Sequence, residues 1–143
     1  VARPERVCGL VGVAAAPDFT EDLIWSALSP EARREIETRG KWIRPSEYDE
    51  AGYPITRHLI EEGRENLLLR GPIAIRCPVR LIHGLEDESV PWEVSRKLMG
   101  ALDSGDVSLT LVKGGDHRLL EPADIGRLIG TIEALCGEME KDH

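Results

Sequence analysis

The sequence has little basic charge, few aromatic side chains and no long apolar run. Its 143 residues include 18 lysines and arginines against 26 aspartates and glutamates, which gives a net charge of −8 and a pI near 5.0. This acidic balance provides no electrostatic attraction to nucleic acid or to an anionic membrane surface. The longest apolar stretch, residues 7–16, has about half the length that spans a bilayer. We therefore expect no nucleic-acid partner and no membrane span.

Cysteine is also scarce, and its spacing excludes the common cysteine-based sites. Cys8, Cys77 and Cys136 form no C-x-x-C pair and no Cys/His metal pattern. Single buried thiols in a reducing compartment explain them best, so we expect a cytoplasmic protein. Nothing in the sequence calls for a bound cofactor or a resident metal.

The apolar residues that are present predict a parallel α/β fold. The run 7–15 is continuously apolar, which is typical of a central strand covered on both faces. A second strand is predicted at 79–82, and a third at 107–112, where alternation favours a place near the sheet edge. Apolar positions at helical spacing follow the second strand from Pro91 and the third from Pro122. This order of strands and helices is typical of a parallel layered structure.

The segment 17–71 is much longer than an ordinary crossover between two strands. Ser29 and Pro30 open a charged helix that Gly40 closes, and a second helix is predicted to carry Leu59, Ile60, Leu67 and Leu68. We interpret residues 17–71 as a helical cap, or lid, inserted into one domain that spans 1–143.

The insertion holds five of the six aromatic residues: Phe19, Trp25, Trp42, Tyr48 and Tyr53. We predict that Phe19, Trp25 and Trp42 line a substrate groove. The sequence supports equally well that these rings pack the insertion against the sheet.

Two polar loops follow the second and third strands. The first is 83–91, with Asp87, and the second is 113–117, with His117. A right-handed crossover between parallel strands brings both loops to the carboxyl edge of the sheet, where such sheets bind ligands. There a carboxylate can accept from imidazole Nδ1–H and leave Nε2 free as a general base, so we predict Asp87 and His117 as catalytic residues.

Other interpretations of these loops stay open. A lone aspartate in a turn usually accepts from nearby backbone, and Asp116 is more typical of a loop-shaping residue than of a second acid. For His83, a structural hydrogen-bonding role is favoured. A metal-dependent hydrolase could use His83, Asp87, Asp116 and His117 as ligands, although no helix-borne H-x-x-x-H accompanies them.

The motif H-G-x-x-D-x-x-V-P at 83–91, followed by G-G-D-H at 114–117, resembles the acid and histidine loops of α/β-hydrolases. With residues 16–19 and 90–92, nearly the whole chain looks like the palmitoyl-protein thioesterase and acyl-glucuronide esterase branch of that family. The resemblance implies Asp87 as the triad acid, His117 as the triad base and residues 17–71 as the lid. It also implies a small-molecule or acylated-protein ester or thioester as substrate, and a mitochondrial location if the relatives are animal proteins.

The chain departs from this family in one large respect. The nucleophile of the family sits in a G-x-S-x-G elbow, and none of the seven serines has glycines two positions away on both sides. Because the chain also begins at Val1 rather than Met, we interpret it as resembling the C-terminal half of a hydrolase. We therefore expect the chain alone to be inactive. Asp18 remains an alternative triad acid, because some proteins of this fold carry the acid after the earlier strand.

A non-catalytic role is the main alternative. If residues 7–15 form a central strand without its earlier neighbour, an apolar edge with unpaired backbone groups is exposed. Such an edge would pair with another chain or with a second copy.

Overall fold

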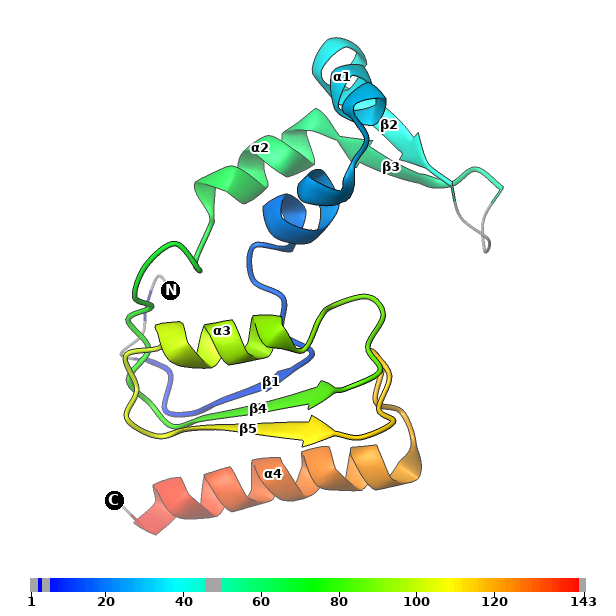
Figure 1. The fold of residues 1–143 in the computed structure, drawn as a ribbon. Helices are drawn as coiled ribbons and strands as arrows, with labels where there is room; N and C mark the ends of the chain where they lie inside the picture. Colours follow the sequence, from blue (N-terminus) through cyan, green and yellow to red (C-terminus); the bar gives the residue numbers. More distant parts are fainter. Residues whose placement is uncertain (1–2, 4–5, 46–49, 142–143) are drawn as a thin grey trace. The chain divides into compact units, whose positions relative to one another are not determined.

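The computed structural model describes residues 3, 6–45 and 50–141, and the chain divides into two units (Figure 1). The sheet unit comprises Val1–Ala16 and Leu69–His143, and the insertion unit is Pro17–Leu68. The insertion unit ends a few residues before the boundary expected at residue 71. Its role as a lid stays a prediction.

The sheet unit contains the predicted parallel sheet. Its strands are β1 (Leu10–Val13), β4 (Val79–Gly84) and β5 (Val107–Val112), in the order β1-β4-β5. Both pairings are parallel, with Val79 opposite Leu10 on one side and Val107 on the other. The α/β fold class and the edge position of β5 are therefore confirmed.

The central strand is β4 and not the first strand, which corrects the expectation for residues 7–15. Five of the six β4 residues are buried, whereas β1 is half-buried and Val13 is 37% exposed. Apolar composition alone could not distinguish the two strands, because burial depends on having a neighbour on both sides. Cys8 and Cys136 are exposed and Cys77 is only partly buried, so the expectation of buried thiols was wrong.

Two helices cover opposite faces of this sheet (Figure 1). They are α3 (Glu93–Ala101) and α4 (Pro122–Lys141). The main core joins β4 to α3, and its buried members are Leu69, Ile73, Val79, Leu81, Leu98 and Leu102. Among the residues with described placement, no helix is long and apolar enough to cross a membrane.

The apolar residues of α4 form the single stripe that the sequence predicts, but only one side of this stripe is buried. Leu135 is buried and Leu128 packs against the core, but Ile125, Ile129 and Ile132 are each more than 40% exposed. Helical periodicity groups apolar residues without showing which part of a wide stripe meets the sheet.

The insertion unit contains a hairpin that the sequence did not predict. A π-helical turn (Thr20–Ile24) and a 3₁₀ turn (Trp25–Ala27) lead into α1 (Pro30–Arg39). Strands β2 (Lys41–Arg44) and β3 (Tyr53–Thr56) then pair antiparallel, and α2 (Arg57–Glu65) follows.

Capping chemistry explains the helix α1. The Ser29 hydroxyl accepts from Ala32 N–H at 3.2 Å, and Gly40 ends the helix with a φ of 81°. Both ends were predicted. The second helix is shorter than expected, because α2 ends at Glu65 and leaves Leu67 and Leu68 outside it.

The core of the insertion unit is formed by Ile36, Ile55 and Ile60, and both Trp25 and Trp42 pack against it. The guanidinium groups of Arg33 and Arg64 also lie 5.4 and 4.7 Å from the centroid of the Trp25 ring. Each such cation–π contact contributes about 0.5–1 kcal/mol at exposed sites. The tryptophans therefore stabilise the insertion unit itself.

Candidate active site

The acid loop, residues 85–91, leaves the carboxyl end of β4 and folds around Asp87. One carboxylate oxygen of Asp87, Oδ1, accepts from the backbone N–H groups of Ser89 and Val90, both at 2.8 Å. The side chain of Asp87 is fully buried. Two backbone donors thus fix one oxygen, and the other is left for a different partner.

The histidine loop, residues 113–119, leaves the carboxyl end of β5 and is shaped by Asp116. Asp116 Oδ1 accepts from the N–H groups of Arg118 at 3.1 Å and Leu119 at 2.8 Å. These bonds support Leu119 in the left-handed region, at a φ of 48°. Asp116 therefore has the loop-shaping role that the sequence favours.

Two glycines let the acid loop and the histidine loop approach each other closely. A Cβ atom on Gly84 would collide with the carbonyl oxygen of Gly115, and one on Gly115 would lie 3.1 Å from the Gly84 Cα. Across this crossing the N–H of Glu86 donates to the Gly115 carbonyl at 2.9 Å, and Leu85 N–H donates to the Val112 carbonyl at 2.9 Å. Only a residue without a side chain fits at this contact.

The crossing brings His117 and Asp87 together. His117 Nδ1 lies 2.9 Å from Asp87 Oδ2, and because a carboxylate only accepts, Nδ1 carries the proton. The His117 side chain is 47% exposed, and Nε2 has no hydrogen-bond partner among the described residues. The imidazole thus has one nitrogen held by a buried acid and the other presented to solvent, which is the arrangement of a general base.

The pKa of Asp87 lies below its usual value of 3.8. Burial alone would raise this pKa, but the N–H groups of Val90 and Ser89 and the His117 imidazole all stabilise the ionised form, and together they outweigh burial. Asp87 therefore stays ionised beside His117 at neutral pH.

Comparison with known proteins gives consistent results. The chain is 44% identical over 140 residues to palmitoyl-protein thioesterase ABHD10, mitochondrial, from Mus musculus, and 41% identical to the Homo sapiens protein of that name. These matches cover 97% of this chain and 47% and 45% of the two relatives. Among solved structures, mouse alpha/beta hydrolase domain-containing protein 10 has a TM-score of 0.84 at 44% identity, covering 96% of this chain and 55% of that one.

The chain has the α/β-hydrolase fold and resembles the C-terminal half of these proteins. A putative hydrolase from Agrobacterium vitis S4 also has a TM-score of 0.84, at 43% identity over 90% of this chain and 49% of that one. The search against protein-family models found no match. The chain spans about half the length of the curated relatives it matches. Those relatives are named as mitochondrial, and no comparison supports the cytoplasmic expectation.

His83 is completely buried beneath the acid loop. Its Nδ1 lies 2.7 Å from the Ser95 hydroxyl on α3, and its Nε2 lies 2.9 Å from the Val90 carbonyl oxygen and 3.2 Å from Asp87 Oδ2. Both ring nitrogens are thus engaged inside the protein. No group of three or more His, Cys, Asp or Glu residues with metal-binding geometry occurs among the residues that the structure describes.

Asp18, the alternative acid, lies in the insertion unit. Its Oδ1 accepts from Leu68 N–H at 2.6 Å, a bond that joins the two ends of the insertion, and its own φ is 65°. This carboxylate has a local structural role, whereas the carboxylate in contact with His117 is that of Asp87.

The three aromatic residues predicted to bind substrate differ in exposure. Trp25 and Trp42 are partly buried in the core of the insertion unit itself, a packing role that the sequence did not predict. Phe19 is 46% exposed. Tyr48, which was counted with them, lies outside the described residues. A substrate contact of Phe19, Trp25 and Trp42 stays a prediction.

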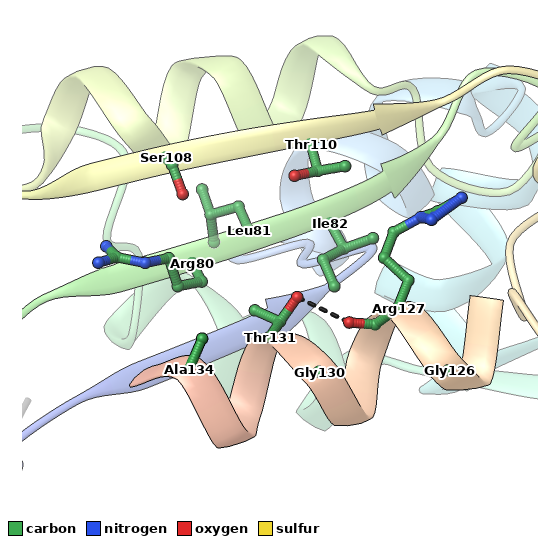
Figure 2. A pocket seen from close by; sticks show the side chains of 10 residues that line it. All are labelled: Arg80, Leu81, Ile82, Ser108, Thr110, Gly126, Arg127, Gly130, Thr131 and Ala134. Atoms are coloured by element: carbon green, nitrogen blue, oxygen red, sulfur yellow. Dashed lines mark hydrogen bonds between the residues drawn. The ribbon is translucent and has the colours of Figure 1, made fainter. Parts of the chain in front are cut away.

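A cavity of about 340 Å³ lies between α4 and the sheet, away from the histidine–aspartate pair (Figure 2). It forms where Gly126, Gly130 and Ala134 give α4 little bulk. Arg80, at one end, is held by Asp106 at 2.8 Å and Glu138 at 2.7 Å. The hydrogen bond to Asp106, and to a smaller extent the contact with Glu138, raise the pKa of Arg80. The ion pair between Arg80 and Glu138 joins β4 to α4. Neither Asp87 nor His117 lines this cavity.

Proposed function

We propose that this chain supplies the acid and the base of a serine-dependent hydrolase that cleaves a carboxylic ester or thioester. The observation that carries the proposal is the 2.9 Å contact between His117 Nδ1 and a buried, ionised Asp87 at the ends of adjacent parallel strands. The homology to proteins named palmitoyl-protein thioesterase supports the thioester class. The nucleophilic serine would come from outside these 143 residues, because no G-x-S-x-G occurs in them.

In this mechanism His117 transfers one proton in each half of the catalytic cycle. Nε2 first takes the proton of the serine hydroxyl as the serine oxygen bonds to the acyl carbon, and the imidazolium is stabilised by Asp87. The imidazolium then donates that proton to the departing alkoxide or thiolate as its bond to the acyl carbon breaks. In the second half of the cycle, His117 takes a proton from water as the water oxygen bonds to the acyl carbon. It returns that proton to the serine oxygen as the acyl–serine bond breaks, which releases the carboxylic acid. Throughout, Asp87 keeps the proton on Nδ1.

We further propose that the insertion unit contributes the acyl-binding surface. Phe19, which is 46% exposed, would contact the acyl chain, and Trp25 and Trp42 would support that surface from the core of the unit. Replacing Phe19 by alanine should then raise KM for long-chain more than for acetyl substrates.

The test uses the complete gene product that contains this chain. It should label with a fluorophosphonate probe, hydrolyse p-nitrophenyl esters and S-acyl thioesters, and keep its activity in a chelator. An Asp87→Asn variant should lose most of its turnover, whereas Asp18→Asn should retain it. Loss of turnover only in Asp18→Asn would overturn the assignment of the acid. Activity that is chelator-sensitive and resists the probe would favour the metal-dependent alternative.

A second candidate is a non-catalytic module that pairs with another chain. It is favoured by β1, which is hydrogen-bonded to β4 alone and so, within the described residues, leaves its other edge open. Sedimentation equilibrium of the 143-residue chain should then show a concentration-dependent dimer or larger species. A stable monomer over the accessible concentration range would contradict this role.

A further inference from the structure

The buried side chain of His83 has a hydrogen-bond partner at each of its two ring nitrogens. His83 lies in the central strand β4 and has no exposed surface. Ser95, on helix α3, is also completely buried. The two side chains are 2.7 Å apart. A buried imidazole in contact with a buried hydroxyl fixes the orientation of the ring.

The tautomer of His83 follows from its partners. Its Nε2 is 2.9 Å from the carbonyl oxygen of Val90, and because a carbonyl oxygen only accepts, Nε2 carries a proton. In the neutral ring Nδ1 is then the acceptor, and the Ser95 hydroxyl donates to it. Ser95 thus holds the imidazole with its Nε2–H directed at the acid loop.

The same nitrogen also lies close to the histidine–aspartate pair. Nε2 of His83 lies 3.2 Å from Asp87 Oδ2, the oxygen that also accepts from His117 Nδ1 at 2.9 Å. The other oxygen of Asp87 is held by two backbone N–H groups. Because His83 and His117 flank a single oxygen, a displacement of the His83 ring would displace the acceptor of His117.

We propose that His83, oriented by Ser95, is a positioning residue for Asp87. It holds both Oδ2 and the Val90 end of the acid loop, so that the carboxylate meets His117 in a productive geometry. The inference rests on the proposed function, because positioning has a catalytic meaning only if Asp87 is the triad acid. It goes beyond that function because it gives a role in catalysis to His83, which is completely buried and so cannot contact the substrate.

The test is made in the complete gene product with His83→Leu, His83→Gln and Ser95→Ala. A loss of about 1 Å in alignment costs on the order of 10²-fold in rate, so His83→Leu should lower kcat by roughly that factor with little change in KM. His83→Gln keeps an N–H close to the Nε2 position and should restore kcat to within about tenfold of the parent. Ser95→Ala should lower kcat by less than His83→Leu does.

A spectroscopic readout separates positioning from a merely structural role. The proton on His117 Nδ1 should give a low-field NMR signal, and the signal should shift or broaden in His83→Leu and recover in His83→Gln. If His83→Leu fails to fold, His83→Gln and Ser95→Ala carry the test. Parent-like kcat together with a parent-like Nδ1–H signal in all variants that fold would overturn the proposal.

The Asp87→Asn variant distinguishes the two levels of failure. If it remains fully active, the proposed function itself is wrong and the role of His83 falls with it. If Asp87→Asn is inactive but the His83 and Ser95 variants match the parent, only the positioning role is wrong.

Discussion

Asp87 and Asp116 have the same local structure and different surroundings. In each, Oδ1 accepts from the backbone N–H groups two and three residues further along the chain. The second oxygen of Asp87 meets two imidazoles in a side chain that is fully buried, whereas Asp116 lies on an exposed part of its loop. A turn motif thus places an aspartate, and the crossing of two strand ends determines whether its second oxygen meets an imidazole.

The largest expected effect on turnover comes from replacing His117, the imidazole that contacts Asp87. His117→Gln should lower the turnover of the complete gene product by about 10⁵- to 10⁶-fold, since loss of the base disables the nucleophile. Steady-state hydrolysis of a p-nitrophenyl ester measures this loss. Turnover within tenfold of the parent would show that His117 is not the base.

The second prediction compares the two aspartates directly. Asp87→Asn places an amide N–H₂ opposite Nδ1, which forces the proton of His117 onto Nε2, so turnover should fall by about 10⁴-fold. Asp116→Asn keeps the oxygen that shapes its loop and should change turnover by less than about threefold.

The double variant Asp87→Asn with His117→Gln sharpens this comparison. Because the two residues act as a unit, it should be no less active than His117→Gln alone. Additive losses would mean that the pair is not coupled.

The third prediction concerns the contact between Gly84 and Gly115, where the acid loop and the histidine loop cross. Gly84→Ala puts a Cβ against the Gly115 carbonyl and should separate the loops, with a loss on the order of 10²-fold in turnover and about 1–3 kcal/mol in the free energy of unfolding. Gly100→Ala on α3 is the matched control, because its Cβ would contact nothing within 4 Å. Equal effects of the two substitutions would contradict a special role for the crossing.

The smallest effect concerns acid stability. Because the pKa of Asp87 is lower in the folded chain than its usual value of 3.8, its stabilisation of the fold is complete above that pH and is lost as the pH falls through the lower, folded value. Urea unfolding between pH 6 and pH 2 should show this loss in the parent, and Asp87→Asn should lack that part of the pH dependence. An identical pH dependence in both proteins would refute the assigned shift.

Local signals in the sequence predicted the parts of the fold that are fixed locally. Ser29 and Gly40 mark the ends of α1 because cap chemistry acts within one turn. Asp87 and His117 were found because each follows a recognisable strand, and parallel strands bring their ends to one edge.

The missed features depend on tertiary packing. The β2–β3 hairpin was missed because its strands are four residues each, carry Pro54 and have no alternating apolar pattern. The exposure of Ile129 depends on neighbours that a pattern does not contain. The contact of Ser95 with His83 joins two residues twelve positions apart on different elements, so no motif marks it.

The unequal exposure of the histidines has a consequence for chemical labelling. His83 is fully shielded, His117 is about half exposed, and His58 on α2 has a side chain that is 81% exposed. An acylating reagent for imidazole, followed by peptide mass spectrometry, should therefore modify His58 and His117 and spare His83. The exposed imidazole of the histidine–aspartate pair can thus be monitored before any substrate has been identified.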